Sequence, residues 1–149
     1  MAINQQLTGR VYPAPHPYEV TRGKIREFTT AIGDANPLYL DRAAAVEAGY
    51  PDVIAPPTFP IIVDMEAVGQ AVVDPELNLD FARVVHAGQQ FRYSRPLRAG
   101  DRVSTVTRIA DIKALGRNEV ITFESEITDE AGAHVVTAVN TLAVRGAGD

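Results

Sequence analysis

The segment from Thr58 to about Val73 constrains the fold most, because it has the length and composition of a helix that is apolar on nearly all sides. Its apolar residues are Phe59, Ile61, Ile62, Val63, Met65, Ala67, Val68, Ala71 and Val72. A surface helix carries an apolar stripe on one face only, so a uniformly apolar helix is expected in the interior. The sequence therefore predicts a long central helix that the rest of the chain covers.

After Asp80 the sequence changes to the period-two pattern of β-strands. Strands are predicted at 90–95, 101–112, 118–128 and 134–144. Turn residues at 115–118 and 129–132 join the last three strands into an antiparallel meander. An antiparallel sheet wrapped around a central helix is an α+β hot-dog fold. An α+β sandwich with surface helices also fits the strands, but it does not account for the uniformly apolar helix.

Two shorter helices are predicted before the central one. Thr21 is a suitable N-cap for a helix at 22–32, and Gly33 ends that helix. Asp41 is the expected cap of a second helix at 42–48. Asp34 is therefore expected in a loop, directly after a helix terminus.

Composition narrows the class of protein. A length of 149 residues with 46% hydrophobic residues predicts one domain spanning residues 1–149. The chain has no cysteine, and His16, His86 and His134 are scattered, so no metal site and no cofactor are expected. A net charge of −5 argues against nucleic acid. Without a leader pattern or a long apolar run, we expect a cytoplasmic protein with no membrane partner.

The segment Gly33-Asp34-Ala35-Asn36-Pro37-Leu38-Tyr39 carries polar groups suited to acid–base chemistry. The Asp34 carboxylate can orient water or act as an acid. A phenol such as Tyr39 has an ordinary pKa of ~10 and is a poor base at neutral pH, whereas an imidazole near ~6.5 is a competent one. The same residue types also build turns, and the sequence alone leaves both interpretations open.

This segment resembles the signature of the MaoC-like (R)-specific enoyl-thioester hydratases and hydroxyacyl dehydratases. That signature reads Gly-Asp-x-Asn-Pro-hydrophobic-His and continues to an acidic residue, here Asp41. In the family, the aspartate and the histidine together move a proton and water across the C2–C3 bond of an acyl thioester. Tyr39 stands at the histidine position in this chain. The resemblance implies a hot-dog fold and a degenerate site with Asp34 and Asn36 as its catalytic residues.

Two further segments extend the resemblance over nearly the whole chain. The stretch Phe91-x-Tyr93-x-Arg95-Pro96-Leu97-x-x-Gly100-Asp101 is similar to one that recurs in MaoC-type domains, and we expect it to form a β-turn. The stretch Ile54-Ala55-Pro56-Pro57-Thr58-Phe59 stands where the hydratases begin their central helix with Ala-His-Gly. There, free N–H groups hold the thioester carbonyl. Two prolines lack an N–H, so only Thr58 and later residues could serve that carbonyl.

These departures at the base and at the carbonyl site argue against an autonomous hydratase. The chain resembles the non-catalytic HadA/HadC-type subunit of actinobacterial two-subunit (3R)-hydroxyacyl-carrier-protein dehydratases, in which a sister MaoC-like subunit brings the Asp/His pair. The resemblance implies a heterodimer with such a subunit, or a homodimer when alone, acting on acyl-ACP or acyl-CoA in fatty-acid metabolism. Expected substrate-binding residues are Tyr39, Thr58, Phe59 and Ile62.

Other functions remain open. One is a homodimeric enoyl-thioester hydratase or acyl thioesterase that uses Asp34, with Asn36 holding a water and Tyr39 donating a hydrogen bond. Another is a module that binds an acyl thioester or a lipid without turnover. Four arginines that lie close in sequence could dock an acidic carrier protein: Arg92, Arg95, Arg98 and Arg102. The expected interpretation is that they are solvated charges at strand edges.

Overall fold

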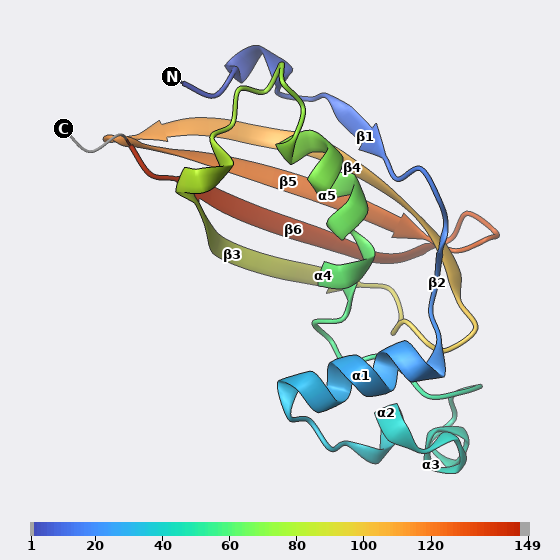
Figure 1. Cartoon of the computed structure of the whole chain (residues 1–149). Coiled ribbons are helices and arrows are strands. Elements are labelled where there is room, and N and C mark those ends of the chain that lie inside the picture. Colours follow the sequence, from blue (N-terminus) through green and yellow to red (C-terminus); the bar gives the residue numbers. More distant parts are fainter. Residues whose placement is uncertain (1, 147–149) are drawn as a thin grey trace.

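The computed structural model describes residues 2–146 (Figure 1). The helical elements are η1 (Gln5–Leu7), α1 (Arg22–Ile32), α2 (Pro37–Leu40), α3 (Arg42–Glu47), α4 (Pro60–Val63), α5 (Met65–Val72) and η2 (Phe81–Arg83). The strands are β1 (Val11–Pro13), β2 (Tyr18–Glu19), β3 (Val84–Tyr93), β4 (Arg102–Leu115), β5 (Asn118–Thr128) and β6 (His134–Val144). Among these described residues, each helix falls short of what a bilayer crossing requires. The predicted domain, 1–149, extends beyond the described residues at both ends.

The strands form one antiparallel sheet in the order β1-β4-β5-β6-β3, with β2 also paired to β4. The predicted meander of the last three strands is confirmed, and β5 and β6 have the predicted bounds. The β3 strand begins at Val84, earlier than the predicted 90, and β1 and β2 were not predicted. Within the described chain, β3 pairs only with β6, so its other edge is unpaired.

The central helix differs from the prediction of one helix over 58–73. It begins at Pro60 and is interrupted at Asp64, which separates α4 from α5. Proline is favoured at the first helical position, and Pro60 takes that place. The predicted segment is also less buried than its composition indicates, because Met65 in α5 is 60% exposed and Val73, directly after α5, is 77% exposed.

The α4–α5 segment lies against one face of the sheet, while α1, α2 and α3 lie together beyond one end of it (Figure 1). Buried residues form two clusters. One joins α1, α2 and the loops to the ends of β5 and β6, and includes Ile25, Phe59, Ile127 and Val136. The other lies under α5 at the opposite end and includes Val68, Leu77, Ile121 and Phe123. A sheet packed around a central helix is the predicted hot-dog arrangement.

Candidate functional site

The predicted loop after α1 is confirmed. Thr21 caps α1, since its side chain accepts the Lys24 N–H, and the helix ends at Gly33. Gly33 adopts the left-handed conformation with φ of 73°, which glycine reaches without the steric cost of a Cβ atom. The N–H of Asp34 then donates to the Thr29 carbonyl at 3.1 Å, and this contact positions Asp34 beside the helix end.

Asp34 and Asn36 both have structural tasks in this loop. The Asp34 Oδ1 atom accepts the Asn36 N–H at 3.1 Å, and the Asn36 Oδ1 atom accepts the Leu38 N–H at 3.0 Å as the N-cap of α2. Such bonds are what Asp and Asn do in turns. The turn interpretation is therefore correct, and it leaves the second carboxylate oxygen of Asp34 and the amide nitrogen of Asn36 for other partners. Their catalytic roles stay predictions.

Tyr39 is buried, with 8% of its surface exposed. Burial raises the pKa of its phenol above the ordinary value, and the nearby Asp34 carboxylate and Tyr50 raise it further. A base at neutral pH would need the opposite shift. Tyr39 is therefore a neutral hydroxyl group, able to donate or accept a hydrogen bond but unsuited to taking a proton from carbon.

The structure adds a residue that the sequence did not assign to the site. The hydroxyl of Tyr93, at the end of β3, donates to the carbonyl of Pro57 at 2.6 Å. Partial burial is the main cause that raises the pKa of the Tyr93 phenol, and the nearby Tyr39 phenol raises it further. We call Tyr39, Tyr50 and Tyr93 the tyrosine cluster. The alternation of Phe91 and Tyr93 predicted a strand but could not show which loop it faces.

Backbone donors are scarce in the loop that leads into α4. Prolines stand at positions 56 and 57 of the loop and at position 60, where α4 begins. The Phe59 N–H donates to the Pro56 carbonyl, and the Ile61 N–H donates to the Thr58 carbonyl. Within residues 2–146 the N–H of Thr58 has no hydrogen-bond partner, and Thr58 is exposed. Thr58 and later residues were expected to supply the N–H for a thioester carbonyl. In this loop the N–H of Thr58 is the one left for that role.

Phe59 and Ile62 have different surroundings. The Phe59 side chain is fully buried, and its ring packs edge-on against Phe28 at 5.5 Å and Tyr18 at 6.3 Å between centroids. This is the packing of a core residue. Ile62 lines a cavity of about 280 Å³ together with Val63 and Met65. Substrate contact stays a prediction for both, and the open cavity favours Ile62.

Asp64 is an ionisable group that sequence reasoning missed. It lies between α4 and α5 with 1% of its surface exposed, and its Oδ2 atom has no hydrogen-bond partner in the described chain. Burial raises the pKa of its carboxyl to about 7, and a hydrogen bond from Ser125 only partly opposes that rise. Ser125 in turn lies 2.7 Å from the Thr107 hydroxyl across β4 and β5. The central helix therefore contains a carboxyl group that is largely desolvated.

The second sequence motif has a structural role. Arg95 bonds both carboxylate oxygens of Asp101, at 2.8 and 3.0 Å, and the Arg98 N–H donates to the same carboxylate. The expected turn is thus held by an ion pair. The four arginines of this region all have acidic partners within 4 Å: Glu124 for Arg92, Asp101 for Arg95 and Arg98, and Glu19 for Arg102. This neutralisation favours solvated charges over a docking patch.

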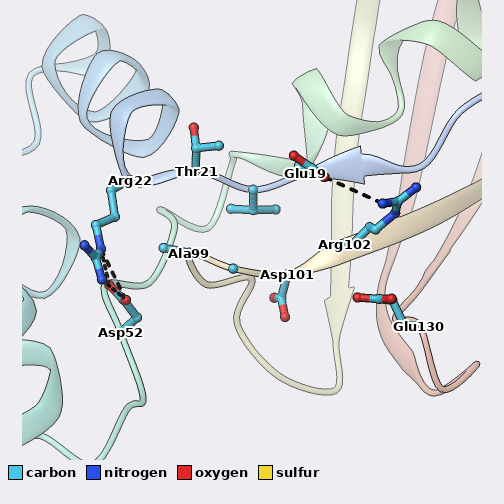
Figure 2. Close-up of a pocket in the computed structure, with 10 residues that line it drawn as sticks. Glu19, Thr21, Arg22, Asp52, Ala99, Asp101, Arg102 and Glu130 are labelled. Atoms are coloured by element: carbon cyan, nitrogen blue, oxygen red, sulfur yellow. Dashed lines mark hydrogen bonds and ion pairs between the residues drawn. The ribbon is translucent and has the colours of Figure 1, made fainter.

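An open cleft of about 650 Å³ lies where β2, the start of α1 and the turn after β5 meet (Figure 2). Figure 2 shows Arg22 facing Asp52, and Arg102 facing Glu19, with dashed lines between each pair. None of the predicted site residues lines this cleft. Because the two share no residue, the cleft is distinct from the site at the tyrosine cluster.

Known proteins place this geometry in a family. A "UPF0336 protein" of Thermobifida fusca is 66% identical over 146 residues, which is 98% of this chain and 96% of that protein. A solved structure of a MaoC-like dehydratase superposes with a TM-score of 0.89 at 29% identity over 96% of this chain and 43% of that one. A chain of the HadBC (3R-hydroxyacyl-ACP dehydratase) complex from Mycobacterium tuberculosis gives a TM-score of 0.83 at 24% identity over 92% and 96%.

These structures confirm the hot-dog fold and the resemblance to MaoC-like dehydratases. The model of the family described as "FAS1-like, dehydratase domain region" matches residues 6–138, which include the loop after α1, the tyrosine cluster and the whole of β3 to β5. The chain therefore belongs to the family of FAS1-like dehydratase domain regions.

Proposed function

We propose that this chain is the substrate-binding, weakly catalytic or non-catalytic subunit of a (3R)-hydroxyacyl-thioester dehydratase of fatty-acid metabolism, and that it works with a catalytic MaoC-like subunit. The observation that carries the proposal is Tyr39. It occupies the position of the family's base, and burial raises its pKa, away from the range a base needs. A partner that supplies the Asp/His pair would complete the chemistry.

The carbonyl site supports the same division of labour. An oxyanion hole needs preorganised donors, and loss of one costs about 10²- to 10³-fold in rate. The loop before α4 offers one free N–H, that of Thr58. One donor is enough to orient a thioester but provides less stabilisation for a developing negative charge than two. Binding without efficient turnover follows from this geometry.

The β3 edge is the surface we assign to the partner. An unpaired edge exposes backbone donors and acceptors, and pairing it with the equivalent strand of a second hot-dog chain would extend the sheet. The exposed fractions of Val85 and Tyr93 on β3 are 41% and 39%. Tyr93 also belongs to the tyrosine cluster, so the site would lie beside the junction. The HadBC complex, whose fold this chain shares, contains two different subunits by name.

The experiment compares the purified chain alone with the chain co-expressed with a MaoC-like subunit that carries an intact Asp/His pair. Hydration of crotonyl-CoA is followed by loss of its enoyl absorbance. We expect little turnover by the chain alone and clear turnover by the pair. Full turnover by the isolated chain that Asp34→Ala abolishes would instead establish the homodimeric hydratase. Release of free thiol from acyl-CoA by the isolated chain would indicate a thioesterase.

Two variant pairs separate the base from the carbonyl site. Tyr39→His is expected to create measurable hydration in the isolated chain, whereas Tyr50→His places an imidazole in the same cluster away from the motif position and should not.

Thr58→Pro removes the one free donor, while Thr58→Ala keeps it. Acyl-CoA binding, measured by calorimetry, should weaken in Thr58→Pro only. Equal binding by these two variants would exclude the Thr58 N–H as a substrate contact.

A further inference from the structure

A second group of reactive side chains lies away from the tyrosine cluster. Ser94 follows β3, and its hydroxyl is 2.5 Å from Nδ1 of His134, the first residue of β6. His134 Nε2 lies 2.7 Å from the Thr137 hydroxyl and 3.4 Å from the Glu126 carboxylate. Glu126 and Thr137 are register partners on β5 and β6. A serine, a histidine and a carboxylate thus form a continuous chain of contacts in space.

The direction of the hydrogen bonds determines which nitrogen of His134 carries the proton. The Thr137 hydroxyl donates to the Glu126 carboxylate, at 3.0 and 2.9 Å to its two oxygens. That hydroxyl has a single proton, so it must accept from the Nε2–H of His134. In the neutral ring Nδ1 then has a lone pair, and the Ser94 hydroxyl donates to it. The ring is therefore oriented as a base toward Ser94.

This group faces away from the central helix. Ile127 and Val136, the neighbours of Glu126 and Thr137, are fully buried, and alternation along a strand turns adjacent side chains to opposite faces. Ser94 and Glu126 are exposed, and His134 is half-buried. Ser94 also points away from its neighbour Tyr93, which faces the candidate acyl-thioester site. A small ester can reach Ser94 from solvent without entering that site.

We propose that Ser94 is a nucleophile for acyl transfer from esters and thioesters with good leaving groups, with His134 as its general base. Thr137 and Glu126 are positioning residues that fix the tautomer of His134. Activation of a serine by a histidine oriented by a third group is the general arrangement of nucleophilic catalysis. The proposal is independent of the dehydratase role.

The reaction balances without a further reactant. The Ser94 oxygen attacks the carbonyl carbon as its proton passes to Nδ1 of His134. The bond to the leaving oxygen or sulfur breaks, and His134 returns the proton to that atom. Water then attacks the acyl-Ser94 ester with His134 taking one of its protons, and the serine oxygen departs with that proton to release a carboxylic acid.

Arg92 is the available group for the negative charge of the carbonyl oxygen. It lies two residues before Ser94 along the extended chain and so on the same face, roughly 6.6 Å away between Cα atoms. Its side chain is 59% exposed, and its guanidinium contacts Glu124 at 3.6 Å, a loose ion pair that leaves donors available. A single mobile cation stabilises charge less than a preorganised oxyanion hole. We therefore expect acylation of Ser94 to be faster than hydrolysis of the same ester by solvent, but slower than acylation of the serine in a hydrolase.

The test treats the full chain with p-nitrophenyl acetate and identifies the acetylated residue by mass spectrometry of its peptides. We expect an adduct on Ser94 that Ser94→Ala removes, together with loss of the nitrophenol burst. His134→Gln should slow acylation by about 10²-fold or more, as expected for removal of a general base. Ser104→Ala, which removes an exposed serine of β4, and His86→Gln, which removes an unrelated exposed imidazole, should leave both readouts unchanged.

The positioning role has its own readout. Thr137→Val breaks the connection from His134 to Glu126 and is expected to slow acylation about tenfold, whereas Thr137→Ser restores the hydroxyl and the rate. Thermal melts of each variant verify that the fold is retained. Absence of an adduct on Ser94, an unchanged burst in Ser94→Ala, or equal rates for Thr137→Val and Thr137→Ser in folded protein would each overturn the proposal.

Discussion

Asp64→Asn is expected to change how the stability of the protein depends on pH. The carboxyl of Asp64 has a pKa of about 7 in the folded protein because it is buried, against 3.8 for an exposed aspartate. Asparagine has nearly the same shape and cannot ionise. The substitution therefore removes one titration while it keeps the volume of the side chain between α4 and α5.

The direction in which stability changes with pH follows from proton binding to Asp64. Between about pH 4 and pH 7 the folded protein holds a proton on Asp64 that the unfolded chain has released, so raising the pH favours unfolding. The stabilising contribution of Asp64 to the free energy of unfolding is fully present below pH ~4 and is lost as the pH rises through about 7. At about 1.4 kcal/mol for each pH unit, the total change is about 4 kcal/mol.

The assay is urea denaturation of both proteins at several pH values from about 4 to about 8, at one fixed protein concentration because assembly would also alter apparent stability. The wild type should lose about 4 kcal/mol relative to Asp64→Asn across this range. Asp111→Asn, which removes a partly exposed carboxylate of β4, provides the matched baseline. Parallel curves for the wild type and Asp64→Asn would refute the argument that burial holds a proton on this carboxyl.

Three further predictions concern stability, measured as the free energy of unfolding in urea. Thr21→Ala removes the acceptor for the Lys24 N–H and should cost about 1 kcal/mol, whereas Thr21→Ser should cost much less. Phe59→Ala leaves a void between packed rings and should cost about 3–5 kcal/mol, and a loss below ~1 kcal/mol would mean that Phe59 is not a core residue. Tyr93→Phe removes only the hydroxyl that the Pro57 carbonyl accepts and should cost about 1 kcal/mol; no loss would show that this bond is replaced by water.

Elements specified by local signals could be predicted from the sequence. The α1 helix has a capping threonine at one end and a left-handed glycine at the other, and its predicted and observed bounds agree. The β5 and β6 strands are bounded by turn residues and have the bounds predicted for them. In each case the residues that fix the element lie within it or next to it in sequence.

The start of the central helix could not be predicted, because three prolines in five residues are each suited to the first helical position. Pro60 occupies it, directly after Phe59, whose ring packs against Phe28 of α1, a contact that the local sequence does not contain. The break and the burial at Asp64 could not be predicted either. Apolar neighbours in the sequence indicate that a segment is buried, but they do not show that a carboxyl group within it is buried as well.

The candidate site was predicted in its loop but not in its contacts. Asp34, Asn36 and Tyr39 come from one short segment, so the motif located them together. The contact between Tyr93 and Pro57 joins residues 36 positions apart, and that between Ser94 and His134 joins residues 40 apart. The first contact depends on how the loop before α4 packs beside β3, and the second on how β3 and β6 align in the sheet, and no local sequence pattern contains either.

The hydrogen bond from Tyr93 fixes the rotation of a single amide plane. The carbonyl of Pro57 and the N–H of Thr58 belong to one planar peptide group and point in opposite directions. Because the phenol anchors the oxygen at 2.6 Å, the hydrogen on the other side can aim in only one direction. Tyr93 lies on β3, whose outer edge is unpaired in the described chain, so a partner that shifted this strand would also rotate the amide. In the proposed assembly, binding of the partner at β3 and the direction of the Thr58 N–H would thus be coupled through the Tyr93 hydroxyl.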